Sequence, residues 1–122
     1  MKDMSSQMNI KQWSIYLVDL HPKAGTKPGK IRPCLCIRPD YFSNLPSSVI
    51  LPFTSKLPLS SQSSFPVRLR VPSGVAGLDV ESDLLIDQIL SWDNRKFISE
   101  LGELPIAYRG DVKFYLKEFL DL

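Results

Sequence analysis

The sequence has little of the material from which metal sites, disulfide frameworks and membrane spans are built. Its 122 residues include one histidine and two cysteines, and no apolar run approaches the about 20 residues that cross a bilayer. Cys34 and Cys36 stand two apart, so on a strand they share one face, too few for a metal site and poorly placed to bridge each other. We therefore expect packed thiols, no metal, no cofactor and no membrane span.

Common catalytic templates are also missing. There is no GxSxG, no Walker A loop, no GxGxxG and no HExxH. The only histidine, His21, has no acidic or cysteine partner nearby in the sequence. The N-terminal residues lack an apolar stretch of signal-peptide length, which predicts a cytoplasmic location.

Charge is distributed unevenly although the formal net charge is only +2. Residues 21–38 hold five basic and no acidic residues, whereas residues 71–122 hold five basic and ten acidic ones. A basic half joined to an acidic half fits a polyanion-binding face on a modestly charged protein. The alternative is a solvated surface on which the charges are scattered.

Ten prolines against six glycines predict frequent breaks between short elements. Five segments are rich in β-branched, aromatic or alternating apolar residues, as strands are. These predicted strands are residues 13–20, 31–38, 47–53, 65–71 and 83–90. The last is apolar enough to be buried on both faces. Residues 23–30 and the serine-rich residues 57–64 predict loops.

The C-terminus has the pattern of a helix. Asp111 is a plausible N-cap, and one apolar stripe follows it at helical spacing. The stripe is Val112, Tyr115, Leu116, Phe119 and Leu120. A shorter helical turn is expected around residues 93–99. Five or more short strands and one terminal helix predict a mainly β fold, a small bent barrel closed by a helix.

Residues suited to binding phosphate recur without any metal-ligand set. Arg32 ends a basic, glycine-containing loop at the start of a strand, and its planar donors can hold two oxygens at once. Thr54 and Ser55 follow the third strand in a turn that leads into Lys56. Polar residues 87–88 interrupt an apolar strand and need a partner or a purpose if buried.

Four motifs resemble, in order, those of the MazF/PemK family of toxin endoribonucleases. The first runs from Trp13 to the Gly29-Lys30-Ile31-Arg32-Pro33 entry to the second strand, which is one residue longer than the family's Gly-x-Arg-Pro. The others are Pro52-Phe53-Thr54-Ser55, GLDVESDLLIDQ at 77–88 and Leu101-Gly102-Glu103-Leu104. The likeness covers residues 12–122 as a single domain and leaves residues 1–11 as an N-terminal extension.

The resemblance implies an SH3-like twisted β-barrel and a homodimer. It also implies a metal-independent, sequence-specific endoribonuclease (an mRNA interferase) that cuts single-stranded RNA and leaves 2′,3′-cyclic phosphate and 5′-hydroxyl ends. Such a protein is the toxin of a type II pair, held inactive by a MazE/PemI-like antitoxin laid across the RNA groove.

Catalytic roles are carried over from the resemblance to Arg32, Thr54 and Asp87. Asp87 is either the base that accepts the 2′-hydroxyl proton or a structural anchor beneath the site. The residues expected to hold RNA are Thr26, Lys27, Lys30, Ser55, Lys56, Arg68 and Gln88. Tyr41, Phe42 or Phe53 either stacks an unpaired base or belongs to the core.

Departures from the family pattern leave the general acid open. Lys27 stands where the family usually has Glu, and Thr26 and Leu85 stand where some members have histidine and arginine. Two alternatives follow. One is a non-catalytic toxin of the same fold that binds DNA gyrase, a class that relies on tryptophan near the C-terminus, whereas this chain ends FLDL. The other is a catalytically lapsed barrel that binds RNA or a peptide.

Overall fold

Antiparallel strands and one C-terminal helix make up the fold. A computed structural model describes residues 8–21, 30–57 and 67–122. The strands are β1 Ser14–Asp19, β2 Ile31–Cys36, β3 Ser47–Thr54, β4 Arg68–Val71, β5 Ser82–Leu85, β6 Leu90–Asp93 and β7 Phe97–Glu103. The helix is α1 Ile106–Leu120, and short 3-10 turns lie at η2 Asp40–Phe42, η3 Ile86–Gln88 and η4 Asn94–Lys96. The predicted mainly β fold with a C-terminal helix is confirmed.

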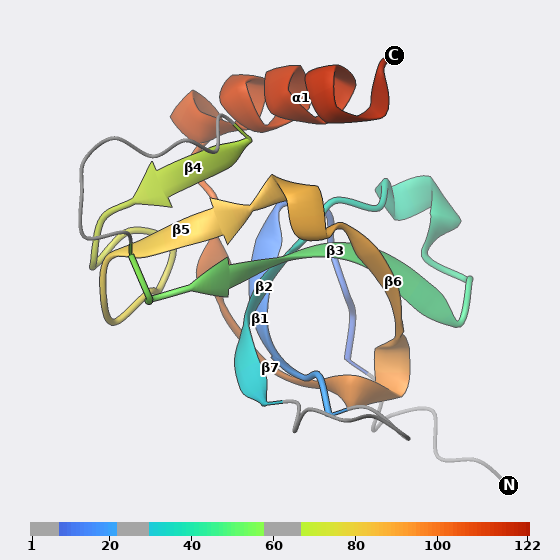
Figure 1. The fold of residues 1–122 in the computed structure, drawn as a ribbon. Helices are drawn as coiled ribbons and strands as arrows, with labels where there is room; N and C mark the ends of the chain where they lie inside the picture. Colours follow the sequence, from blue (N-terminus) through green and yellow to red (C-terminus); the bar gives the residue numbers. More distant parts are fainter. Residues whose placement is uncertain (1–7, 22–29, 58–66) are drawn as a thin grey trace, which may run out of the picture.

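Strand β3 is the central element of the sheet. The hydrogen-bonded order is β4-β5-β3-β2-β1-β7, and β6 also pairs with β3. The first half of β3, Ser47–Ile50, pairs with β6, whereas its end, Phe53 and Thr54, pairs with β5. Figure 1 shows the resulting strong curl, with α1 lying across one end beside β4. The end of β3 therefore lies between β2 and β5.

The first three predicted strands are confirmed within a residue or two of their predicted ends. The predicted strand 65–71 is seen from Arg68, with Val71 buried and Val67 and Leu69 packed on the core as the alternation predicts. Most of the two predicted loops, 23–30 and 57–64, lies outside the described residues.

The prediction of a single strand over residues 83–90 is wrong. The chain leaves β5 after Leu85, makes the 3-10 turn η3 and resumes as β6 at Leu90. Both strands pair with β3, at opposite ends of it, so the chain must turn between the two pairings. Asp87 and Gln88 consequently occupy an exposed or half-buried corner instead of a strand interior.

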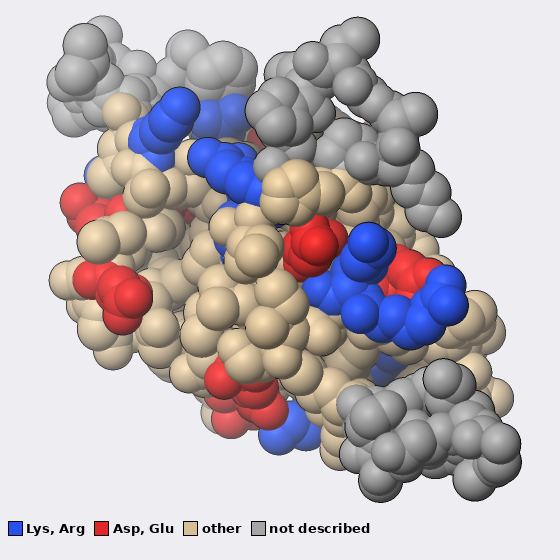
Figure 2. All heavy atoms as spheres, turned by 90° about the horizontal axis from the view of Figure 1, so that it is seen from below, with Lys and Arg blue, Asp and Glu red and all other residues tan. Residues whose placement is uncertain are grey.

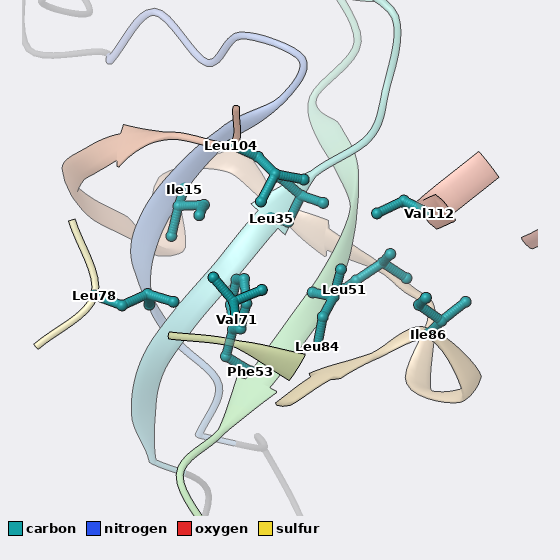
Figure 3. Packing of buried hydrophobic residues seen from close by; sticks show 10 residues of the cluster. All are labelled: Ile15, Leu35, Leu51, Phe53, Val71, Leu78, Leu84, Ile86, Leu104 and Val112. Atoms are coloured by element: carbon teal, nitrogen blue, oxygen red, sulfur yellow. The ribbon is translucent and has the colours of Figure 1, made fainter. Parts of the chain in front are cut away.

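The main hydrophobic core lies between the curled sheet and the helix. Its buried members come from five strands, the turns and α1, and Figure 3 shows them pointing toward one another. They are Ile15, Leu35, Leu51, Phe53, Val71, Leu78, Leu84, Ile86, Leu104 and Val112. Phe53 is 1% exposed, so among its two interpretations it belongs to the core.

A second core cluster fills the other face of β1 and β2. It includes Tyr16, Val18, Cys34, Cys36 and Ile10. Both cysteines are free and buried, which confirms the prediction of packed thiols. Ile10 is 5% exposed, although it precedes the predicted domain start at residue 12; the division into an extension and a domain stays a prediction.

Helix α1 begins five residues before the predicted N-cap. It starts at Ile106, directly after Pro105, and Asp111 lies inside it. Proline is favoured at helix starts. Gly110 lies in the exposed interior of the helix, where glycine costs about 1 kcal/mol relative to alanine and is tolerated. No helix among the described residues is long and apolar enough to cross a membrane.

The segment 93–99 is helical only over the turn η4, where the carboxylate of Asp93 accepts a hydrogen bond from the Arg95 backbone N–H at 2.8 Å. From Phe97 the chain is strand β7, for which no strand was predicted. Strand β7 pairs with β1 through two irregularities in register. Those irregularities blur the alternation of apolar residues by which a strand is recognised.

Candidate active site

Arg32 lies near the start of β2, opposite Val18 of β1 in the strand register. Its side chain extends to the end of β3, where Nη1 donates a hydrogen bond to the carbonyl oxygen of Phe53 at 3.4 Å. That long bond uses one of the five guanidinium N–H donors. The remaining donors leave the group able to bind an anion in the space beside it.

Thr54 is the last residue of β3 and is half-buried. Its Oγ1 accepts a hydrogen bond from the backbone N–H of Lys56 at 3.2 Å. The hydroxyl therefore caps the turn, as a purely structural role would require. Because that bond uses a lone pair of the oxygen, the hydroxyl proton stays available to a ligand.

Arg32 lines two hollows of about 340 Å³ each. The Thr54 hollow is lined by residues 30–33, 53–55 and 77–80 with Leu17, Ser82 and Leu101. The Asp87 hollow is lined by Leu20, Arg32, Pro52, Leu85 and residues 87–90. The structure thus brings Arg32 and Thr54 to one hollow, and Arg32, Asp87 and Gln88 to the other.

Asp87 is paired with a basic residue of strand β4, Arg68. Its Oδ1 lies 3.6 Å from Nε of Arg68 in β4, and each of the two side chains is about one fifth exposed (20% and 23%). Gln88 Nε2 donates to Asp87 Oδ2 at 3.5 Å, the outer limit of a hydrogen bond. Arg68 and Gln88 therefore orient the carboxylate at the rim of the Asp87 hollow.

The other predicted RNA-binding residues are distributed as follows. Lys30 and Ser55 line the Thr54 hollow and are exposed, and Lys56 follows Ser55 on the surface. Thr26 and Lys27 lie outside the described residues. Tyr41 and Phe42 stand in η2 before the start of β3, with their rings tilted against each other at 4.4 Å between centroids. Both are exposed, so they do not belong to the core, and neither lines one of the two hollows.

The wall formed by residues 77–82 was not predicted as part of the site. A Cβ placed on Gly77 would stand 2.1 Å from the carbonyl oxygen of Leu101, and one on Gly102 would stand 2.6 Å from that of Ala76. Glycines of two of the motifs therefore form one close backbone contact, which holds this wall against β7. Two glycines in separate motifs are the only sequence signal of that contact.

His21 has an acidic partner, contrary to the sequence analysis. Its Nδ1 lies 2.5 Å from Oδ1 of Asp19, only two residues earlier, and its backbone N–H donates to the same oxygen at 3.0 Å. Both hydrogen bonds lower the pKa of Asp19, and the one from the His21 backbone has the larger effect. Among the described residues no three His, Cys, Asp or Glu side chains gather into a possible metal site.

Acidic and basic side chains are interleaved on the surface near the site. Arg70 contacts Asp83 at 2.5 Å and Glu81 at 3.8 Å, and the hydrogen bond that Arg70 donates to the Asp83 carboxylate raises the pKa of Arg70. Figure 2 shows Lys and Arg lying beside Asp and Glu on the face seen from below. Among the described residues, Arg32 is the basic residue that lines both hollows, and Lys30 also lines the Thr54 hollow.

The chain is similar to several bacterial toxins. It is 28% identical over 117 residues to the endoribonuclease MazF6 of Mycobacterium tuberculosis, which covers 94% of this chain and all of the relative. It is 24% identical to the endoribonuclease EndoA of Bacillus subtilis, over 80% of this chain and 82% of the relative. The fold matches MazF of Deinococcus radiodurans with a TM-score of 0.76 at 21% identity, covering 94% of this chain and 99% of that one.

The same fold is seen in the MazE–MazF complex of Deinococcus radiodurans, with a TM-score of 0.74 at 23% identity over 94% of this chain and 99% of that one. The family model for PemK-like, MazF-like toxins of type II toxin–antitoxin systems matches residues 11–120. That match covers nearly the whole chain and agrees with the fold and with the order of the four motifs. The chain belongs to the PemK-like, MazF-like toxin family of type II toxin–antitoxin systems.

Proposed function

We propose that this MazF-type endoribonuclease cuts single-stranded RNA at short sequences by using the substrate's own ribose 2′-hydroxyl as the nucleophile. The bond from the 2′ oxygen to phosphorus forms, the bond from phosphorus to the 5′ oxygen breaks, and the leaving oxygen takes up a proton. The products carry a 2′,3′-cyclic phosphate and a free 5′-hydroxyl. No metal or cofactor takes part, because the nucleophile already belongs to the substrate and only has to be held in line.

One observation carries this proposal: Arg32 and Thr54 line the same hollow. Negative charge builds on the phosphoryl oxygens as the 2′ oxygen attacks. Donors that are already aimed at that charge stabilise it without reorganising, and losing one typically slows the reaction about 100- to 1,000-fold. Arg32 is restrained by its bond to the Phe53 carbonyl, so it is such a donor.

Asp87 receives one of two proposed roles. As a base it would take the 2′-hydroxyl proton from a nucleotide held beside Arg32. As an anchor it would hold Arg68 beside the Asp87 hollow, and the 3.6 Å contact between the two side chains supports this role. We propose that Gln88, Lys30, Ser55 and Lys56 hold the flanking RNA, together with Thr26, Lys27 and Arg68.

Two partners belong to the proposal. We propose an antitoxin of the MazE/PemI type that blocks the RNA groove, a pairing supported by the MazE–MazF structures of a protein with the same fold. We also propose a homodimer, supported by exposed apolar side chains on α1 such as Ile106 at 78% and Phe114 at 58% exposure.

The proposal is tested with Arg32→Ala and with a matched control, Arg95→Ala. Arg95 is 83% exposed and pairs only locally with Asp93 in the described part of the chain, so its loss should leave cleavage unchanged. Arg32→Ala should slow cleavage of RNA at least about 100-fold while the far-UV spectrum and the urea midpoint stay near those of the wild type. Cleavage by Arg32→Ala at the wild-type rate would show that this guanidinium does not act on the phosphate.

A second arm tests the nucleophile. A strand with deoxyribose only at the scission point lacks the 2′-hydroxyl, and we expect no product from it. Continued cutting at that position would contradict the mechanism. A purified wild-type protein that cuts no RNA at all would favour the catalytically lapsed barrel.

A further inference from the structure

Asp79 is an acidic residue in a hollow whose neighbouring groups are suited to binding phosphate. It is exposed and lines the Thr54 hollow together with Lys30 and Arg32. Nevertheless it has no hydrogen-bond or ion-pair partner among the residues that the structure describes. A carboxylate repels a phosphate, so Asp79 is suited to a ligand group that donates hydrogen bonds.

The backbone around Asp79 is held rigidly. Leu78, the preceding residue, is buried in the main core, and its N–H donates to the carbonyl of Val75 at 3.0 Å. Gly77, one residue earlier, packs its α-carbon against the Leu101 carbonyl so closely that no Cβ would fit. The carboxylate is therefore presented from a fixed turn, as a group that discriminates between ligands must be.

An ionised carboxylate only accepts hydrogen bonds, through two oxygens side by side. Bases of single-stranded RNA are read on their Watson–Crick edges. Guanine offers two adjacent donors there, N1–H and the N2 amino group. Adenine and cytosine each place an acceptor beside their one amino donor, and uracil places acceptors on both sides of its N–H. Of the four bases, guanine alone matches both oxygens of Asp79.

The rest of the hollow suits a planar base. Val80, next to Asp79, is 52% exposed, and Ile31, which also lines the hollow, is 50% exposed. Both are apolar, so a base seated in the hollow would cover them from water. The volume of about 340 Å³ lies at the lower end of the range for small-ligand pockets, about 300–1,000 Å³.

We propose that the Thr54 hollow selects a guanine of the substrate RNA, whose N1–H and N2 amino group bind the carboxylate of Asp79. This inference rests on the proposed function. It makes Asp79 a specificity-determining residue, next to the scissile phosphate held by Arg32. It also explains why an acidic residue stands in a hollow that is otherwise basic.

The test compares the wild type with Asp79→Asn on a pool of RNAs of random sequence, with the 5′ ends of the products sequenced. The wild type should show one position near the scission point where guanine is strongly enriched. In Asp79→Asn one acceptor oxygen becomes an amide donor, so cleavage at guanine sites should fall on the order of ten-fold or more. Cleavage at sites with another base there should stay unchanged. Asp111→Asn, on the exposed side of α1, is the matched control and should cut like the wild type.

A second measurement uses inosine, which lacks the N2 amino group. Inosine at the selected position should slow the wild type but not slow Asp79→Asn any further. The inference is overturned if the wild type shows no guanine preference, or if Asp79→Asn keeps it. It is equally overturned if Asp79→Asn weakens binding of a basic protein segment while the cleavage sites stay the same. In each of these cases Arg32→Ala still tests the proposed function separately, because that variant should stop cleavage at every sequence.

Discussion

The close contact between the 77–82 wall and β7 can be measured by adding a single methyl group at Gly77. A Cβ there would stand 2.1 Å from the carbonyl oxygen of Leu101 and 2.6 Å from its carbonyl carbon. Both atoms belong to the backbone of β7, which is paired with β1, so neither can rotate away freely. Gly77→Ala must therefore displace the turn that leads to Asp79.

The expected cost has two parts. The backbone at Gly77 has φ of +79°, a left-handed conformation that costs an L-residue about 1–2 kcal/mol. Forcing extra volume into a packed contact typically costs about 1–3 kcal/mol. Together they predict a loss of about 2–5 kcal/mol in the free energy of unfolding. Gly74 has a similar φ of +84°, but a Cβ added there would meet no atom within 4 Å, so Gly74→Ala should lose only the first part.

The assay is urea unfolding followed by the fluorescence of Trp13 and Trp92. The two variants are compared with the same dependence of the unfolding free energy on urea concentration, so that a shift in midpoint reports a change in stability. The difference between Gly77→Ala and Gly74→Ala isolates the contact with Leu101 and should be about 1–3 kcal/mol. Equal losses in the two variants would refute the claim that this contact holds the wall in place.

Two further predictions concern stability. Arg70→Met should lower the urea midpoint, because the carboxylate of Asp83 is 4% exposed and would lose its partner. Arg95→Met breaks an exposed pair and should lower the midpoint much less. Equal losses in the two variants would contradict this. Burial raises the pKa of Cys34 from 9.0 to about 12. The folded state therefore holds the Cys34 proton more tightly than the unfolded state does. The protonated thiol's contribution to folding stability is present below pH 9 and is lost as the pH rises toward 12. Urea midpoints that do not fall above pH 9 would contradict this prediction.

Local patterns predicted much of the sheet. Strands β1, β2 and β3 follow from their β-branched and aromatic residues, because such side chains pack well on a pleated surface whatever lies across from them. The placement of Arg32 at the start of β2 and of Thr54 at the end of β3 follows from the same strand boundaries. Two site residues were thus located by strand ends alone.

Other elements depended on partners far away in the chain. The break at η3 exists because β5 and β6 pair with opposite ends of β3, a fact that residues 83–90 do not contain. The start of α1 was misplaced because Gly110 and Asp111 have the local pattern of a helix boundary, whereas packing of Leu104 and Val112 in the core favours an earlier start.

By itself, the sequence determined which residues are suited to binding phosphate, which segments are extended, and, through the order of its motifs, which family they resemble. Only the tertiary structure decided that Arg32 lines two hollows, that Arg68 contacts Asp87, and that Asp79 lines the site at all. The reason is physical: strand propensity and side-chain chemistry are properties of neighbouring residues. A hollow is instead formed by walls from distant segments, and here two of those segments meet in close backbone packing at Gly77 and Gly102.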